Sequence, residues 1–287
     1  MTRSTHVAIL VALALALLAA HAAPPGDPAS CRYPWLDACD PAQALSRRIA
    51  PPEGWVRVDL APGSFGAWLR DLPLKPGRPP VRLHDGRPKG NQAAVVAVVD
   101  LDVGAADLQQ CADAVIRLRA EWLWSIGQAD TAAFHFTSGD LAEWSRWRDG
   151  WRPNVAGSRV TWTHRAAPDA SHATFRGYLD AVFTYAGTLS LAAETAPVPD
   201  PHALRPGDLI VEGGSPGHAV LVVDMAGNAA GELIYLLAQG YSPAQDVHVL
   251  VNPSSPGTSP WYRLADLGDP IVTPEWTFHA GSQRTWR

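Results

Sequence analysis

Four short apolar runs in the last third of the chain constrain its fold most strongly. Each is rich in Val, Ile or Leu, has the length of a strand, and is separated from the next by Gly, Pro or Asn residues. Such runs predict β-strands joined by turns, and short connections favour antiparallel pairing. We therefore expect an antiparallel sheet built from PGDLIVEG, GHAVLVVDM, ELIYLLAQ and DVHVLVN.

Two segments upstream of these runs have helical patterns. In residues 107–126 apolar side chains recur at intervals of three and four, and residues 172–194 form a long, mostly apolar stretch that we expect to be one helix. AAVVAVVDLDV, at residues 93–103, predicts a buried strand. Helices that precede a group of antiparallel strands favour the α+β class, with the helices packed on the sheet.

The hairpin formed by the second and third runs brings two polar residues together. If its turn centres between Asn228 and Ala229, His218 faces Gln239. Opposed residues in an antiparallel pair have Cβ atoms about 5 Å apart. Moving the centre by one residue would leave the two side chains as diagonal neighbours, whereas a half-step slip would place them on opposite faces.

The N-terminal 22 residues have the pattern of a secretory signal peptide. Arg3 precedes a continuous apolar run, and AHA at residues 20–22 offers small residues for cleavage. The run has about 14 residues, fewer than the roughly 20 that cross a bilayer, and an uncleaved anchor is the alternative. We expect an exported chain, periplasmic or secreted, with no stable membrane anchor.

Export affects how the three cysteines are interpreted. In an oxidising compartment Cys31 and Cys39 can close a short local disulfide, which leaves Cys111 unpaired. Cys111 could instead pair with one of them, and that would end any catalytic role for it. A leftover thiol is either buried and inert or kept for its reactivity.

Composition predicts how the chain after the signal peptide divides into a linker, an arm and a domain. Residues 23–30 are Pro-rich, and together with the predicted disulfide loop they make residues 23–50 a linker and a disulfide-tied arm. Residues 51–287 contain the strand and helix patterns and are expected to form a single α+β domain.

Composition also excludes several classes of function. The formal charge is −5. Removal of the signal peptide takes away Arg3 and leaves 22 basic and 28 acidic residues. The sequence therefore lacks the excess of basic residues that nucleic-acid binding requires. The ten His are scattered without an H-x-x-H or H-E-x-x-H motif, so no metal site is expected. GSFG and EGGSPG lack the patterns of nucleotide-binding loops, and we expect no cofactor.

Cys111, His218 and Gln239 could together carry out nucleophilic chemistry. A thiolate attacks a carbonyl carbon, a nearby imidazole takes and returns the proton, and an acceptor behind the imidazole selects its tautomer. The Gln110 amide or the N–H groups of the helix start could stabilise an oxyanion. Asp107 and Gln110 fit a capping box, however, which would place Cys111 a turn inside the helix on its apolar face, as a buried structural thiol.

A known group of enzymes shares these elements. QQC at a helix start, PGDLIVEGGSPGHAVLVVD, and a strand that ends in LAQ resemble the CHAP and NlpC type of papain-like amidohydrolase. The resemblance implies a papain-like core with helical insertions, in which Cys111 is the nucleophile, Gln110 the preceding amide, His218 the base and Gln239 the orienting residue. Bacterial members commonly cleave peptide or amide bonds in peptidoglycan, so a cell-wall peptide or glycan is the implied substrate.

A second resemblance extends over more of the chain, from about Trp55 onward. DLQQCADAVIRLRAEWL, FHFTSG, LLAQGYSPAQDVHVLVNP and PWY resemble an uncharacterised family of bacterial exported proteins that is described as a domain of unknown function. This resemblance implies no particular activity.

A segment rich in Trp and Arg provides candidate substrate-binding residues. Trp144, Trp147, Arg148 and Arg152 could form a rim that binds sugar or peptide, and Tyr241 is a further candidate; packing in a core or lid is the alternative. Two functions therefore follow from the sequence. The first is an exported cysteine hydrolase that cleaves a peptide or amide bond. The second is a non-catalytic module of the same fold that binds cell-envelope glycan or peptide.

Overall fold

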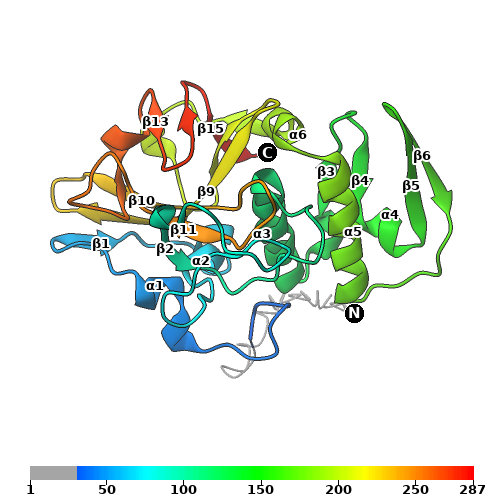
Figure 1. Ribbon diagram of the computed structural model, residues 1–287, viewed down its shortest axis with the longest axis horizontal. Helices are drawn as coiled ribbons and strands as arrows, with labels where there is room; N and C mark the ends of the chain where they lie inside the picture. The colour runs from blue at the N-terminus through cyan, green and yellow to red at the C-terminus, as the bar shows by residue number, and fades with distance from the viewer. Residues whose placement is uncertain (1–30) are drawn as a thin grey trace, which may run out of the picture. The chain divides into compact units, whose positions relative to one another are not determined.

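The computed structural model describes residues 31–287, so the predicted signal peptide and the Pro-rich linker lie outside the described residues. The described chain is α+β, with a large antiparallel sheet and six α-helices (Figure 1). The helices are α1 (Leu45–Arg48), α2 (Phe65–Arg70), α3 (Cys111–Ser125), α4 (Trp144–Arg148), α5 (His172–Tyr185) and α6 (Thr188–Glu194). None of them is long and apolar enough to cross a membrane.

The main sheet contains nine strands, and every pairing in it is antiparallel. They are β1 (Trp55–Arg57), β2 (Val95–Val98), β7 (Thr195–Pro197), β8 (Leu209–Glu212), β9 (His218–Asn228), β10 (Leu233–Gln239), β11 (His248–Leu250), β12 (Tyr262–Arg263) and β15 (Gln283–Trp286). Their order is β2–β11–β10–β9–β8–β15–β7, with β1 paired to β9 and β12 paired to β10. The four strands predicted in the last third of the chain are confirmed as β8 to β11.

Three small hairpins lie outside the main sheet. They are β3 (Ala133–His135) with β4 (Leu141–Glu143), β5 (Trp151–Ala156) with β6 (Arg159–His164), and β13 (Ile271–Val272) with β14 (Thr277–Phe278). The first two, together with α4 and α5, form the part of the chain that follows α3, and α3 contacts both α5 and β9 (Figure 1).

Strand β9 is buried on both faces and divides the interior into two cores. Leu221 and Val223 pack in the core that contains α3, whereas Val220 and Val222 pack in a second core on the other face. Alternation of side chains along a strand produces this division. It also explains why the sequence of β9 is almost continuously apolar.

The register of β9 against β10 differs from the expected one. Leu233 pairs with Gly227, so the turn lies further along the chain, and that register alone would place His218 and Gln239 on opposite faces. A bulge shifts the register between Leu236 and Leu237. The extra residue in β9 restores the parity, and the two polar side chains share a face as diagonal neighbours.

A buried carboxylate lies beside the bulge. Asp224 is fully buried and accepts hydrogen bonds from Nε of Arg57 and from Nε of Arg70, each at 2.7 Å. Arg57 belongs to β1 and Arg70 to α2, so this one carboxylate links three elements. Removing one partner from such a buried charge cluster would leave an uncompensated charge.

The prediction of one long helix at residues 172–194 is wrong, because the chain leaves the helical conformation between α5 and α6. Ala186 and Gly187 are extended, and Ser190 Oγ accepts the N–H of Gly187 at 3.0 Å, which starts a new helix. The apolar pattern continues across the break, so periodicity alone does not reveal it.

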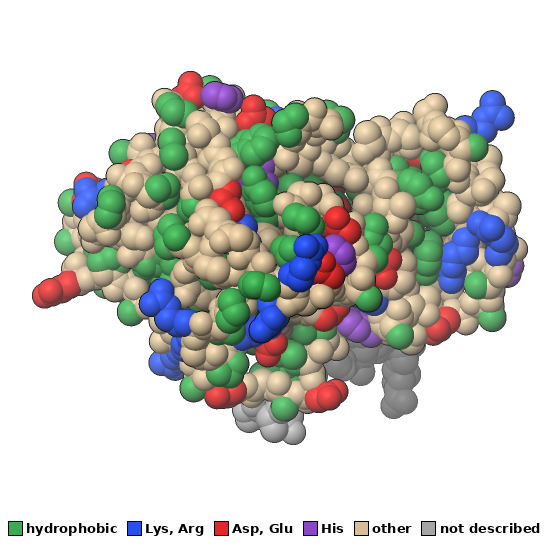
Figure 2. All heavy atoms as spheres, in the orientation of Figure 1, with side chains coloured by type: hydrophobic (Ala, Val, Ile, Leu, Met, Phe, Trp, Pro, Cys, Tyr) green, Lys and Arg blue, Asp and Glu red, His purple; other side chains and the backbone are tan. Residues whose placement is uncertain are grey.

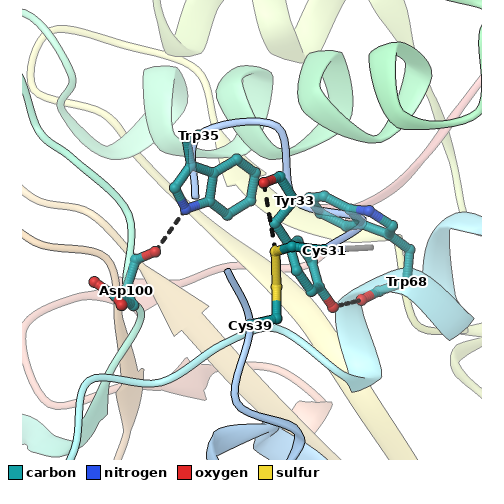
Figure 3. The surroundings of a disulfide bond; sticks show 6 residues. All are labelled: Cys31, Tyr33, Trp35, Cys39, Trp68 and Asp100. Carbon is teal, nitrogen blue, oxygen red and sulfur yellow. Dashed lines mark hydrogen bonds between the residues drawn. A yellow bond between two sulfur atoms is a disulfide. The ribbon is translucent and has the colours of Figure 1, made fainter. Parts of the chain in front are cut away.

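The N-terminal arm is part of the domain rather than a separate unit. Cys31 and Cys39 form the predicted disulfide (Figure 3). The Tyr33 hydroxyl donates to the carbonyl of Trp68 at 3.0 Å, and Trp35 Nε1 donates to the carbonyl of Asp100 at 2.6 Å. Tyr33 belongs to the same core as α3, so the expected boundary at residue 50 does not separate two structural units.

Replacing Cys31 and Cys39 together by Ser should lower the free energy of unfolding by roughly 2–3 kcal/mol, because the short disulfide loop restricts the unfolded chain. Urea denaturation of the wild type and the double variant measures this difference. Reductant should destabilise the wild type to the same extent and leave the double variant unchanged. An equal effect of reductant on both proteins would show that the disulfide is not the cause.

Candidate functional site

Cys111 is the first residue of α3, not a residue one turn inside it. The capping box expected from Asp107 and Gln110 is wrong: Gln110 is the N-cap, and its backbone N–H donates to Oδ2 of Asp113 at 3.0 Å. Asp107 instead accepts the backbone N–H of Ala244 at 2.6 Å, from the loop that follows β10. The helix therefore begins at the thiol.

The thiol of Cys111 is free and lines a cavity of about 540 Å³. The walls come from the start of α3, the break between α5 and α6, the loop before β9, and Ser242 after β10. Gln110 also lines this cavity, and its amide Nε2 donates to Oδ1 of Asp107 at 3.1 Å. Cys111 is half-buried, so part of its side chain is open to this cavity.

The environment of Cys111 keeps the thiol protonated at neutral pH. Burial raises its pKa to about 11, and the Asp113 carboxylate acts in the same direction. Backbone N–H groups of Ala219, Ala112 and Cys111 itself act in the opposite direction without outweighing burial. Burial also raises the pKa of Asp113 to about 8, so much of its negative charge is absent at neutral pH.

His218 and Gln239 lie in contact, as the strand pairing predicts. Nε2 of His218 is 2.7 Å from Oε1 of Gln239, and both residues are almost completely buried. The hydrogen bonds of residues 31–287 leave Nδ1 of His218 without a partner.

The partners of Gln239 determine which nitrogen of His218 carries the proton. Gln239 Nε2 donates to Oε2 of Glu275 at 2.8 Å and lies 3.4 Å from Nε2 of His248. Nδ1 of His248 is 3.0 Å from the carbonyl of Asp246, so that nitrogen is the donor and Nε2 is the acceptor. Because both neighbours accept from the amide nitrogen, the amide oxygen must face His218. His218 then carries its proton on Nε2, and the lone pair is on Nδ1.

A lysine completes this buried polar cluster. Lys89 Nζ donates to Oε2 of Glu275 at 2.7 Å and lies 4.7 Å from the centre of the Tyr241 ring. In the amide orientation that satisfies both of its polar atoms, Gln245 accepts from Lys89 Nζ at 3.2 Å. The cluster therefore contains a matched pair of charges.

The sequence gives no local signal for Lys89, Glu275 or His248. Lys89 comes from a Pro-rich loop, His248 from the fourth predicted strand and Glu275 from the C-terminal region. The rarity of lysine, of which the chain has only Lys75 and Lys89, is the one feature that could have drawn attention to this loop.

The imidazole of His218 is neutral at neutral pH. Burial lowers its pKa to about 4, and the nearby Lys89 charge contributes in the same direction, while the hydrogen bond to Gln239 opposes the shift. A neutral imidazole with a defined tautomer is able to accept a proton at Nδ1.

Cys111 and His218 lie at the same end of the sheet but are not hydrogen-bonded to each other in the described structure. The N–H of Ala219 acts on the thiol, whereas alternation directs the His218 side chain to the face of Val220. Tyr241 is near both residues. Its ring centroid is 5.0 Å from that of His218, and the pKa of its hydroxyl is raised by burial, then by the Glu275 carboxylate and by the charge of a Cys111 thiolate.

No residue of the Trp-rich segment lines the Cys111 cavity. The prediction that Trp144 binds substrate is wrong, because Trp144 is a core residue. Its side chain is 1% exposed and packs against Phe175 and Tyr178. Trp147 packs on Tyr178 and under the guanidinium of Arg152, at 6.1 and 4.0 Å respectively.

Arg148 also has a structural environment, because it pairs with Asp130 at 2.5 Å and with Asp149 at 3.1 Å. Packing in the core therefore describes Trp144, whereas a binding role for the half-buried Trp147, Arg148 and Arg152 stays a prediction. In the described part of the chain, no group of three His, Cys, Asp or Glu residues is arranged to hold a metal ion.

Protonation of His248 should destabilise the fold as the pH falls from 6.5 to 4. Burial lowers its pKa from 6.5 to about 4, so the unfolded chain takes up the proton first and stability is lost in that window. We expect the wild type to lose about 1 kcal/mol more stability per pH unit there than His248→Asn. Urea denaturation at pH 7, 6, 5 and 4.5 measures this difference, and a constant difference across the series would contradict a neutral buried His248.

Comparison with known proteins identifies a family but no activity. No curated protein and no solved structure matches the chain. A family described as "Domain of unknown function (4846)" matches residues 45–284, most of the chain. The chain therefore belongs to this domain-of-unknown-function family, as the longer of the two sequence resemblances predicted.

Proposed function

We propose that this protein is an exported cysteine hydrolase with a papain-like core, which cleaves a peptide or amide bond in cell-wall peptidoglycan. Cys111 is the nucleophile, His218 the base and Gln239 the orienting residue. One observation carries the proposal: the contacts of Gln239 leave His218 neutral with an unpartnered Nδ1, at the end of the sheet where a free thiol opens into a cavity.

The proposed reaction starts from a neutral thiol and a neutral imidazole. As the Cys111 sulfur attacks the carbonyl carbon, its proton passes to Nδ1 of His218, and the imidazolium is stabilised by the Gln239 oxygen. The proton then goes to the leaving amine as the carbon–nitrogen bond breaks and a thioester remains. Attack of water on the thioester releases the acid and regenerates the thiol.

The position of His218 supports this proposal. It is the first residue of β9, and Gly217 before it lines the same cavity as Cys111. The imidazole would approach the thiol around the end of the strand, since its side chain leaves β9 on the face opposite α3. Tyr241, in contact with the His218 ring, would position the imidazole during this approach.

The start of α3 supports stabilisation of an oxyanion. The first N–H groups of a helix have no partner within the helix and carry its partial positive charge. The N–H groups of Cys111 and Ala112 already favour the charged form of the thiol. They would favour a developing oxyanion in the same way, with the Gln110 amide beside them.

Digestion of purified peptidoglycan sacculi tests the activity. We expect the wild type to release soluble fragments with new amino and carboxyl ends, identified by liquid chromatography and mass spectrometry. Cys111→Ala and His218→Ala should each reduce the rate at least 100-fold, because each removes a group required for bond cleavage. Ser242→Ala, at the wall of the same cavity, is the matched control and should retain activity.

The same experiment separates the proposal from its alternatives. Release of identical fragments by folded Cys111→Ala would refute the role of the thiol. Binding of wild-type protein to sacculi without any cleavage would favour a non-catalytic envelope-binding module instead.

Alkylation measures the resting state of the thiol. With a pKa of about 11, Cys111 should react slowly with iodoacetamide at pH 7, and its rate should rise about tenfold per pH unit between pH 7 and 9. His218→Ala should leave the rate at pH 7 unchanged, because the resting imidazole is neutral. Rapid, pH-independent labelling at pH 6, lost in His218→Ala, would instead indicate a resting thiolate–imidazolium pair.

A further inference from the structure

A second cavity, of about 390 Å³, lies along α3 away from Cys111. Arg119 and Leu123 contribute from α3, Phe134 and His135 from β3, Glu194 from the end of α6, and Trp286 from β15. None of these residues belongs to the wall of the Cys111 cavity. The two cavities are therefore formed by different side chains.

Arg119 has an unusual environment in this cavity. Its guanidinium carbon lies 4.4 Å from the ring centre of Trp122, 5.3 Å from that of Phe65 and 5.4 Å from that of Trp286. Within residues 31–287 it makes neither a hydrogen bond nor an ion pair. Three aromatic rings thus hold a cation whose N–H groups lack protein acceptors.

Within residues 31–287 the N–H groups of Arg119 have no protein acceptor and are not fully enclosed, so they are free to donate to solvent or to a ligand. Arginine carries five N–H donors in a fixed plane, and buried charged groups are normally paired. Burial lowers the pKa of Arg119 to about 10, but the group remains a cation at neutral pH. The π faces of the three aromatic rings attract the Arg119 cation, but the rings offer no oxygen atom that could accept a hydrogen bond from its N–H groups.

The acidic residue in the cavity does not compensate Arg119. Oε2 of Glu194 accepts the backbone N–H of His135 at 2.9 Å and lies 3.1 Å from its Nδ1. Arg287 also lines the cavity and has no ion pair within the described residues. Within the described chain, the cavity therefore contains two guanidinium groups without an ion pair, the Glu194 carboxylate, whose buried Oε1 has no hydrogen-bond partner, and apolar side chains from Leu123, Phe134 and Trp286.

We propose that this cavity is a binding site for a small organic carboxylate with a compact apolar body. Arg119 receives the carboxylate through its N–H groups, a geometry in which arginine commonly binds both oxygens at once. Leu123, Phe134 and Trp286 pack against the apolar part of the ligand. The surrounding rings keep the guanidinium in place before the ligand arrives.

Arg146 provides a matched control in the same protein. Its guanidinium lies over the rings of Trp151 and Trp162, at 5.3 and 4.7 Å, and it also makes no hydrogen bond or ion pair within residues 31–287. It does not line this cavity. Substituting Arg146 therefore removes a comparable cation on aromatic rings without altering the proposed site.

Isothermal titration calorimetry with the purified chain tests the site. Sodium benzoate is the probe and benzamide, of similar size but neutral, is the control ligand. We expect benzoate to bind the wild type at least tenfold more tightly than benzamide. Arg119→Met should weaken benzoate binding at least tenfold, and Arg146→Met should leave it unchanged.

Several outcomes would overturn the proposal. They are undetectable benzoate binding at millimolar concentrations, equal binding of benzamide, or benzoate binding that Arg119→Met leaves intact. Inorganic phosphate that binds as tightly as benzoate would also contradict a carboxylate ligand with an apolar body. If circular dichroism shows that Arg119→Met does not fold, Arg119→Lys replaces it; this change keeps the charge, removes the planar fork and should also weaken binding.

Discussion

The bulge in β9 is the constraint on which the candidate site depends. Without the extra residue, His218 and Gln239 would leave the sheet on opposite faces and could not share a hydrogen bond. Asp224 lies beside the bulge and is held by two arginines from β1 and α2. The buried ion cluster and the shifted register therefore occupy the same stretch of one strand.

Electrostatic balance explains how the polar cluster behind this strand can be buried. Glu275 and Lys89 neutralise each other, and Gln239 connects that pair to the two neutral histidines, His218 and His248. Each member restricts the orientation of the next, because a carboxylate only accepts and an ammonium only donates. Such a network preorganises a defined tautomer, which a single His–Gln contact would not determine.

Helix α3 serves both cavities. It begins at Cys111 and places Arg119 about two turns later, in a separate cavity. Between the two, Arg117 is completely buried and pairs with Glu121 at 2.7 Å and with Asp102 at 2.9 Å. These ion pairs attach the middle of the helix to the loop after β2. Arg117 is therefore satisfied by protein groups, whereas Arg119 is not.

The sequence by itself determined the central strands β8 to β11 and the Cys31–Cys39 disulfide, because strand periodicity and nearby cysteines are local properties. It also indicated that His218 and Gln239 lie on adjacent strands, but only the structure revealed the bulge that places both side chains on one face. Only the tertiary structure decided where α3 begins, since Asp107 accepts from Ala244 instead of capping the helix. It also decided which residues surround Gln239 and which aromatic rings enclose Arg119. Those partners come from distant segments, and no local pattern encodes a contact between segments that meet only when the sheet and helices pack.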